Sequence, residues 1–562
     1  MSTLSKVYGR YSWLVGFVSF LLVAWLVQLV PTTRLVSGQS VTGNALLPPL
    51  AAILLAIFTR RLLLALGGGL AVGALLHFGT GALWLGTRRY LWDNLLDTAH
   101  LYIVGFTLLL LGMVQVVARS GGARGIVDAV SGLLNSARRV RVGTVGLGMA
   151  IFFDDYANCM LVGPTMRPLT DRYRVSREKL AYLIDSTAAP VAGLFLVSTW
   201  IGYETGQLGE AARDLGLGLS GYALLLEALP FRFYCIFTLL FVLLNAWSGR
   251  DFGAMRRAEE RASQENKPLR DGAEPLGGVD SRYAEPPAGK PRRWINAALP
   301  VGCVVWVTLG GLVVDGGGWS RLQASPGLSL SLAFWRETLG ASENNVQVLF
   351  GAAGAGALLA VSLSVGQGIL TVGEALMALW QGARSGLYAV AVLVLAWGLA
   401  AVCKDVGTGP LMVSALGAGV PPLAISLVTF TAAAAVAFST GTSWGTMAIL
   451  IPTAAPVAYS LGGLPLLVLA MAAVLDGAIF GDHCSPISDT TLMSSIASSC
   501  DHLDHVRTQM PYAMLTMLVA VIAGYLPAGL GLSPWWSYLG GLVLMLVLLF
   551  LLGRRAAAEY LS

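Results

Sequence analysis

The stretch Val474-Leu-Asp-Gly-Ala-Ile-Phe-Gly-Asp-His-Cys-Ser-Pro-Ile-Ser-Asp-Thr-Thr491 decides the fold class. It ends a long apolar run, yet it contains three aspartates and a histidine. A helix packed only against lipid would not keep so many polar groups, because each is costly to bury in hydrocarbon. The stretch therefore predicts an interrupted helix inside a membrane protein, where its polar groups face one another or a wet cavity.

The composition of the whole chain agrees with a membrane protein. Of its 562 residues, 56% are hydrophobic and 12% are charged, and the mean hydropathy is +0.70. Soluble domains carry roughly 25% charged residues, so soluble, disordered, collagen-like and disulfide-rich classes are excluded. We predict an all-α polytopic membrane protein with about 11–14 helices, some of them half-helices or re-entrant hairpins. We expect it to lie in the lipid bilayer.

Charge is concentrated in one segment. Residues 248–293 hold ten Lys or Arg and eight Asp or Glu, with many Pro and Gly, which predicts a disordered loop. The basic clusters at its ends and Arg554 and Arg555 after the last span place this loop and the C-terminus in the cytoplasm by the positive-inside rule. The positive excess thus reflects topology and not nucleic-acid binding. The predicted organisation is an N-terminal helix and loop (1–45), a first transmembrane repeat (46–247), the linker (248–293), a second repeat (294–531) and a C-terminal helix and tail (532–562).

The two halves resemble each other at a slowly growing offset. Leu66-Gly-Gly-Gly-Leu aligns with Leu349-Phe-Gly-Ala-Ala, and Pro164-Thr165 aligns with Pro452-Thr453. Further along both halves, Asp185 aligns with Asp476. Two repeats, here expected to be inverted, with broken helices in corresponding places indicate the binding site of a secondary transporter.

The first pair of broken segments is Phe152-Phe-Asp-Asp-Tyr-Ala-Asn158 and Ser439-Thr-Gly-Thr-Ser-Trp-Gly-Thr446. A carboxylate at membrane depth persists if it holds a cation or a proton, so Asp154 and Asp155 are candidate ion ligands. Alternatively, one of them caps a half-helix. The hydroxyls of the second segment are suitable ligands for small cations, although they could equally pack between helices.

The second pair of broken segments is Leu183-Ile-Asp-Ser-Thr-Ala-Ala-Pro190 and the stretch 474–491. His483 could carry a proton, because histidine titrates near neutral pH, or it could be a satisfied hydrogen-bond partner of Asp482. The candidate ion- or substrate-binding residues are Asp154, Asp155, Asn158, Asp185, Thr187, Thr440, Thr442, Ser443, Thr446, Asp476, Asp482, His483, Ser485 and Asp489.

Three of the five histidines, His483, His502 and His505, lie close together in the sequence, with Cys484 and Cys500 among them. This grouping suggests a membrane metalloenzyme as a rival function. The cluster lacks the paired spacing of common zinc motifs, and a solvated surface explains its polar residues equally well. We therefore expect neither an enzyme nor a cofactor, and no metal beyond a transported ion.

These motifs allow a family to be named. Gly481-Asp-His-Cys-Ser-Pro-Ile-Ser-Asp-Thr-Thr491 and the segment from Ser494 to Tyr512 resemble the signature of the NhaC-type Na⁺/H⁺ antiporters, and both segments of the first pair are similar to its other characteristic stretches. The resemblance runs from about residue 46 to 530 and departs mainly at the 248–293 loop. It implies an inner-membrane, multi-pass secondary carrier with inverted repeats and broken hairpins at its site.

Together these observations predict that the protein exchanges Na⁺ for H⁺ by alternating access. The two ions, which are its transported substrates, compete at buried carboxylates. The alternative is a sodium- or proton-coupled carrier of an organic acid, of the malate or lactate type, or of an amino acid. Such a carrier needs a basic group that faces the substrate carboxylate, and Arg167 is the nearest candidate in the sequence. The expected partners are lipid and a small cation or small organic substrate, without nucleic acid; a homo-oligomer is compatible with the sequence.

Overall fold

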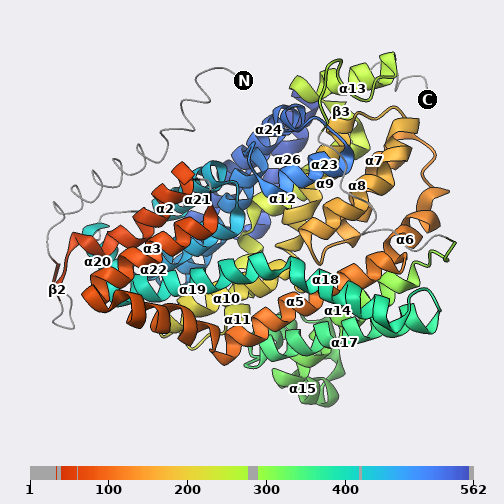
Figure 1. Ribbon diagram of the computed structural model, residues 1–562. Helices are drawn as coiled ribbons and strands as arrows, with labels where there is room; N and C mark the ends of the chain where they lie inside the picture. The colour runs from red at the N-terminus through yellow and green to blue at the C-terminus, as the bar shows by residue number, and fades with distance from the viewer. Residues whose placement is uncertain (1–32, 35–39, 60, 276–288, 417–420, 556–562) are drawn as a thin grey trace.

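The computed structural model describes residues 33–34, 40–59, 61–275, 289–416 and 421–555, and the following description concerns these residues. Nearly all of them are helical (Figure 1). Nine helices in this part of the chain are long and apolar enough to cross a membrane, or ten if the bent pair α11 (Gly221–Ala228) and α12 (Phe233–Ser248) counts as one span. The expected first helix at 11–30 lies outside the described residues. The protein is a polytopic, all-α membrane protein.

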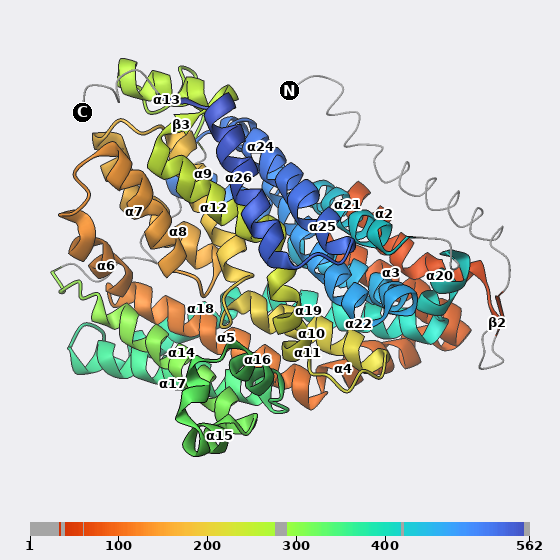
Figure 2. The ribbon, with the colours of Figure 1, turned by 180° about the vertical axis from the view of Figure 1, so that it is seen from behind.

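The polar interior is built from two similar sets of helices. The first set is a hairpin of α7 (Ala137–Ala150) and α8 (Asp155–Arg172), followed by α9 (Arg177–Ala192) and α10 (Thr199–Asp214). The second set is a hairpin of α21 (Pro422–Thr440) and the first part of α22 (Ser443–Cys484), followed by the rest of α22 and α23 (Asp489–Ser498). Figures 1 and 2 show the two hairpins on opposite sides of the molecule, with α10 between them.

The interruptions fall at corresponding places in the two sets. Gly463 has a non-helical backbone (φ 63°, ψ −155°) and divides α22 into two helices, so the second set matches the four helices of the first. Asp154 caps α8 as Thr442 caps α22, and Ser198 caps α10 as Ser488 caps α23. The separations between these paired caps agree with the offset between the sequence repeats.

A second group of helices packs beside these two sets. It contains α3 (Leu62–Phe78), α5 (Thr98–Arg119), α14 (Ile295–Asp315), α17 (Asn345–Gly366), α18 (Val372–Ser385) and α19 (Leu387–Val406), and lies along the lower part of the view in Figure 1. The helix α5 packs on α17 and α18, and α3 packs on α19. This group provides the surface against which the two hairpins and their broken helices close the interior.

The linker departs from the sequence-based prediction. A disordered loop was expected over 248–293, but residues Gly253–Glu265 form a helix, α13, and Arg250–Asp251 (β3) pair with Arg554–Arg555 (β4). The loop prediction was therefore wrong for this part of the linker. One face of α13, with Met255, Ala258, Glu259 and Ala262, is buried, which is the i, i+3, i+4, i+7 spacing of an amphipathic helix. Residues 276–288 lie outside the description.

Ion pairs hold the linker on the ends of two central helices. Arg261 contacts Glu178 of α9 at 2.8 Å, and Arg270 contacts Asp504 of α24 (His502–Val519) at 2.9 Å. Because β3 joins the chain just after α12 to the segment after the last span, α26 (Pro534–Leu552), the linker and the C-terminal segment lie on the same face of the protein.

The remaining elements are short or peripheral. They are β1 (Thr33–Arg34), β2 (Ser40–Val41), η1 (Gly43–Leu46), α2 (Leu47–Thr59), η2 (Gly79–Gly81), η3 (Ala82–Trp92), α4 (Asp93–Leu95), α6 (Gly122–Ser131), η4 (Leu229–Phe231), α15 (Gly318–Ala324), η6 (Pro326–Leu330), α16 (Leu332–Gly340), α20 (Thr408–Leu416), η8 (Ala520–Tyr525) and α25 (Leu526–Gly529).

Candidate functional site

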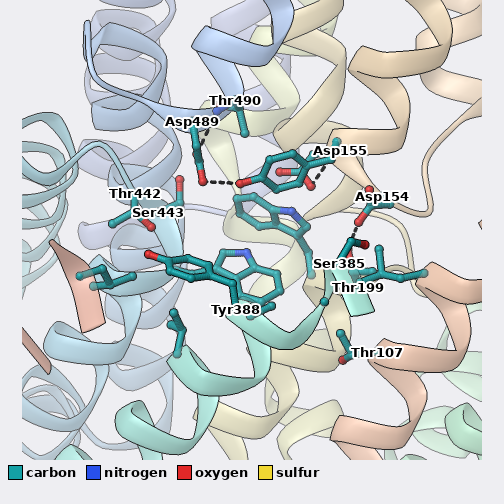
Figure 3. A pocket seen from close by; sticks show the side chains of 18 of the residues that line it. Thr107, Asp154, Asp155, Thr199, Ser385, Tyr388, Thr442, Ser443, Asp489 and Thr490 are labelled. Carbon is teal, nitrogen blue, oxygen red and sulfur yellow. Dashed lines mark hydrogen bonds between the residues drawn. The ribbon is translucent and has the colours of Figure 1, made fainter. Parts of the chain in front are cut away.

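A cavity of about 240 Å³ lies where the two sets of helices meet α5, α18 and α19. Six of the residues predicted from the sequence line it: Asp154, Asp155, Thr442, Ser443, Asp482 and Asp489. Figure 3 shows five of them labelled, with Asp154 and Asp155 on one side and Thr442, Ser443 and Asp489 on the other. Segments from the two halves of the chain, far apart in the sequence, therefore form a single site.

Four half-helices begin at this cavity, namely α8, α10, α22 and α23. In each of them the two residues after the N-cap line the cavity, as Asp155 and Tyr156 do in α8. Each cap side chain accepts a hydrogen bond from the backbone, for example Ser198 from the Ile201 N–H at 3.1 Å and Ser488 from the Thr491 N–H at 3.2 Å. The positive ends of four helix dipoles thus meet at the site, which partly offsets the charge of its carboxylates.

The four carboxylates of the cavity differ in how fully they are hydrogen-bonded. Asp154 accepts from the Ala157 N–H at 2.8 Å with one oxygen and from the Thr199 hydroxyl at 2.9 Å with the other. It is therefore a helix cap, which was the alternative role considered for one of the adjacent aspartates. Asp155 accepts from the Tyr156 N–H at 3.0 Å.

Asp489 and Asp482 lie across the cavity from Asp154. The Tyr156 hydroxyl and the Thr490 N–H both donate to Asp489 (Figure 3). The Thr490 hydroxyl donates to one oxygen of Asp482 at 3.0 Å, while the other Asp482 oxygen is buried without a hydrogen-bond partner. A buried acceptor without a donor is costly, and a bound cation or an added proton would satisfy it.

The cavity has no basic side chain of its own. None of its lining residues within the described part of the chain is a lysine or an arginine. Apart from the carboxylates its walls are hydroxyls, aliphatic side chains such as Leu62 and Val392, and aromatic rings, among them Trp200, Trp444 and Tyr388. The Trp444 ring stacks on Tyr203 with centroids 4.3 Å apart, and it meets Trp200 edge-on at 6.1 Å. The site is thus acidic, and it is wider than a bare ion requires.

Five of the predicted residues that lie outside the cavity have uncharged side chains, and four of them donate hydrogen bonds to backbone carbonyls. Asn158 donates to the carbonyls of Gly148 and Thr187, at 2.7 and 2.9 Å, and so ties the hairpin tip to α9. Thr187, Thr446 and Ser485 donate to the carbonyls of Leu183, Thr442 and Phe438, and the buried Thr440 hydroxyl has no hydrogen-bond partner within the described part of the chain. These contacts stabilise the broken segments, although the residues that make them do not line the cavity.

Asp476 lies in a separate ion cluster. One of its oxygens contacts Arg232 Nε at 2.9 Å, and the other accepts from the Tyr234 N–H and the Tyr525 hydroxyl. Arg232 also contacts Glu204 at 3.1 Å, and all three charged side chains are fully buried. Asp476 is thus already neutralised by a protein cation.

Asp185 lies in a second polar cluster next to the cavity. Its oxygens accept from the hydroxyls of Thr491 and Ser494, at 3.0 and 3.1 Å, and from the side-chain amide of Gln509 at 2.5 Å. His505 lies 4.0 Å away. His483 shares a hydrogen bond of 3.0 Å with Tyr234 through Nδ1, which is the hydrogen-bonded role considered for it, although with a tyrosine instead of Asp482.

The sequence reasoning missed several cavity residues. Thr199, Trp200, Ser385, Tyr388, Trp444, Thr107 and Tyr156 line the site without having been selected. A signal was present for two of them, because Ser198-Thr-Trp200 follows a short apolar loop and Ser is a common N-cap. Ser385 and Tyr388 belong to α18 and α19, which show no interruption that would mark them.

Comparisons with known proteins agree with a transporter. The model of the Na⁺/H⁺ antiporter family matches residues 191–530. An uncharacterized protein of Haemophilus influenzae is 31% identical over 524 residues, covering 91% of this chain and 95% of that protein. The malate-2H⁺/Na⁺-lactate antiporter of Bacillus subtilis is 32% identical over 159 residues, 27% of this chain and 33% of its own length.

A solved structure supports the fold. The YdaH transporter of Alcanivorax borkumensis has a TM-score of 0.54 to this chain at 16% identity, covering 92% of this chain and 99% of that one. At this identity the similarity concerns the fold alone.

Proposed function

The chain belongs to the Na⁺/H⁺ antiporter family, and from this premise we propose that it exchanges Na⁺ for H⁺ across the bacterial or archaeal inner membrane. It is a multi-pass secondary transporter, and its named relatives are transporters and not enzymes. The exchange itself is our proposal.

The acidic cavity is the observation that carries the proposal. Four carboxylates meet there without a lysine or arginine among the described lining residues. An empty, charged cavity is costly to carry through the membrane interior, and bound Na⁺ or protons lower its charge. Because both ions neutralise the same carboxylates, binding of one displaces the other, and competition alone produces exchange.

The ligand set suits a small hard cation. Asp155, Asp489 and the unpaired oxygen of Asp482 supply carboxylate oxygens, and Thr442 and Ser443 add hydroxyls. Asp154 is committed to its helix cap and to Thr199, so we assign it a positioning role. Movement of the hairpins and broken helices against the second group of helices would expose the cavity alternately to the two sides of the membrane.

The arrangement of the linker supports a topology for this exchange. The linker and the C-terminal segment share one face through the β3–β4 pairing, and both are rich in Arg and Lys. The positive-inside rule then places that face in the cytoplasm.

A cation-coupled carrier of an organic acid or amino acid is the alternative, and the size of the cavity favours it. A volume of about 240 Å³ with Trp200, Trp444 and Tyr388 in its walls exceeds the need of a bare ion, and helix N-termini can bind a carboxylate. The Bacillus subtilis relative is named for such substrates. Arg167, the basic residue expected to face an organic acid, instead donates to Ser499 and does not line the cavity.

Proteoliposomes loaded with a pH-sensitive dye test the proposal. We expect Na⁺ gradients to drive proton movement in the opposite direction, and Asp155→Asn to abolish it. Asp93→Asn, an exposed aspartate near the membrane surface, is the matched control and should leave transport unchanged. Uptake of labelled malate, lactate or an amino acid, without Na⁺-driven proton movement, would instead establish the alternative. Full activity of Asp155→Asn would remove that residue from the mechanism.

A further inference from the structure

Two histidines share one serine hydroxyl beside the Asp185 cluster. His505 Nδ1 lies 2.9 Å from Ser495 Oγ, and His502 Nδ1 lies 3.0 Å from the same oxygen. Ser495 and His505 are fully buried, while His502 is half-buried against the exposed Pro486. The three side chains therefore form a hydrogen-bonded path from the surface to the interior, outside the cation cavity.

The surrounding bonds fix where the hydrogens of both rings lie. The Gln509 amide nitrogen donates to Asp185 and to the His483 carbonyl, so its oxygen must face His505. That oxygen lies 3.0 Å from His505 Nε2, which therefore carries a hydrogen. His502 Nε2 lies 2.8 Å from the Pro486 carbonyl and must carry one as well. In a neutral ring Nδ1 is then an acceptor, and in both rings it faces Ser495.

Ser495 has a single hydroxyl hydrogen, for which the two Nδ1 atoms compete with the Thr491 carbonyl, 2.8 Å from the serine oxygen. When both histidines are neutral, that hydrogen can satisfy at most one Nδ1, so at least one ring nitrogen faces the lone pairs of the serine oxygen. One added proton removes this conflict, because the protonated ring donates to Ser495 and Ser495 donates to the other ring. The cluster is therefore built to hold one extra proton, which can sit on either histidine.

The inner end of this path reaches the site. His505 lies 4.0 Å from Asp185, which compensates the charge of a protonated ring. Asp185 accepts from Thr491, and the preceding residue, Thr490, donates to the cavity residue Asp482. The outer end lies near the face covered by the linker, where Arg270 contacts Asp504 (Figure 1).

We propose that His502, Ser495 and His505 form a relay that carries the exchanged proton between the solvent at the linker face and Asp185, next to the cation cavity. The relay rests on the proposed Na⁺/H⁺ exchange and gives its proton a path separate from that of Na⁺. In one transfer, the Nδ1–H bond of protonated His502 breaks as the Ser495 oxygen gains that proton, and the original Ser495 hydrogen moves to His505 Nδ1. His505 then carries a hydrogen on both nitrogens and becomes neutral again when its Nε2–H bond breaks and that proton passes to Asp185, whose oxygen lies 4.0 Å away.

The charged and titratable groups around the relay come from every element packed on it. They are Asp185, Arg177 and Glu178 on α9, Arg167 on α8, Cys159 on α8 through Ser494, Asp482 and His483 on α22, Cys500 and Asp501 before α24, Asp504 on α24, and Arg270 of the linker. The carboxyl groups outnumber the three arginines, and this excess offsets part of the cost that burial imposes on a positive charge at His505.

Reconstituted full-length protein separates a relay from a structural role. The variants are His502→Gln, His505→Gln and Ser495→Ala, and two fluxes are measured: Na⁺-driven proton movement and exchange of radioactive Na⁺ for Na⁺ at equal pH. We expect proton movement to fall about tenfold or more, because a missing proton carrier slows transfer by at least that factor. Na⁺ self-exchange, which moves no net proton, should stay at the wild-type rate.

Two further variants serve as controls. Ser495→Thr keeps the hydroxyl and should retain proton movement, and His77→Gln removes an exposed histidine of α3 and should change neither flux. Wild-type proton movement in His502→Gln and Ser495→Ala would overturn the relay alone. A parallel loss of both fluxes in folded variants would also overturn it, because it would indicate a structural role. A wild type without Na⁺-driven proton movement would overturn the proposed exchange and the relay with it.

Discussion

Asp185 and Asp476 occupy corresponding positions in the two repeats, yet their partners differ. Asp476 contacts Arg232, a permanent cation, at 2.9 Å. Within the described part of the chain Asp185 forms no ion pair with an arginine or lysine; it accepts from two hydroxyls and an amide and lies 4.0 Å from His505. Arginine keeps its charge at every physiological pH, whereas histidine is the side chain whose charge can change near neutral pH. One aspartate thus faces a permanent cation, and the other faces a residue that can gain or lose a proton.

Each aspartate is contacted from the other repeat. Asp476, in the second repeat, meets Arg232 and Tyr234 at the start of α12, the last helix of the first repeat. Asp185, in the first repeat, meets His505 and Gln509 on α24, in the second. The two repeats therefore contact each other in two similar ways. The contact through Arg232 stabilises the fold, whereas in the contact through His505 the histidine can gain or lose a proton.

The largest effect is expected from removing the fixed charge. Arg232→Met leaves Asp476 and Glu204 buried without their shared cation, and loss of one partner of a buried ion pair costs about 3–5 kcal/mol. Denaturant titration of the purified protein in detergent measures the loss of unfolding free energy. Arg321→Met, which removes a half-exposed arginine paired with Glu337, is the control and should cost at most about 1 kcal/mol. Equal losses in the two variants would refute a structural role specific to Arg232.

The second prediction, of a smaller effect, compares the two aspartates by replacing each with asparagine. Asp185→Asn places an amide N–H₂ among three donors, which costs about 1–3 kcal/mol and leaves the fold intact. It also removes the charge that faces His505, so Na⁺-driven proton movement should be lost. Asp476→Asn should show the opposite pattern, with lower stability but intact coupling in the folded fraction. Proteoliposome flux and denaturant titration on both variants test this, and coupling lost in both would remove the distinction between the repeats.

The sequence predicted the class of fold and the core of the site because both leave local signals. Aspartates inside apolar runs are costly, so Asp155, Asp482 and Asp489 could be selected before the cavity was known. The hairpins and the repeat offset followed from Gly, Pro and Ser/Thr at the interruptions. Asp476 was selected by the same reasoning, but burial alone does not reveal that Arg232, far earlier in the chain, neutralises it.

Other features had no local signal. Ser385 and Tyr388 reach the cavity from uninterrupted apolar helices, and only the packing of α18 and α19 against the hairpins brings them there. The linker helix α13 was missed because its charges resemble those of a disordered loop. Charges of the linker are paired with Glu178 and Asp504, and these partners lie far away in the sequence.

The smallest expected effects come from removing one hydroxyl next to each aspartate. Tyr525→Phe removes a hydrogen bond of 2.9 Å to Asp476, and Thr491→Val removes one of 3.0 Å to Asp185. Each change should lower the unfolding free energy by about 0.5–1.5 kcal/mol, the usual net contribution of one hydrogen bond, because the same carboxylate oxygen keeps another donor. The two variants should differ in function, because Asp476 keeps Arg232 while Asp185 loses one of the few donors that stabilise its charge. We therefore expect the pH dependence of Na⁺-driven proton movement to shift in Thr491→Val and to stay at its wild-type position in Tyr525→Phe. A shift in Tyr525→Phe of the same size would mean that both aspartates contribute to proton binding.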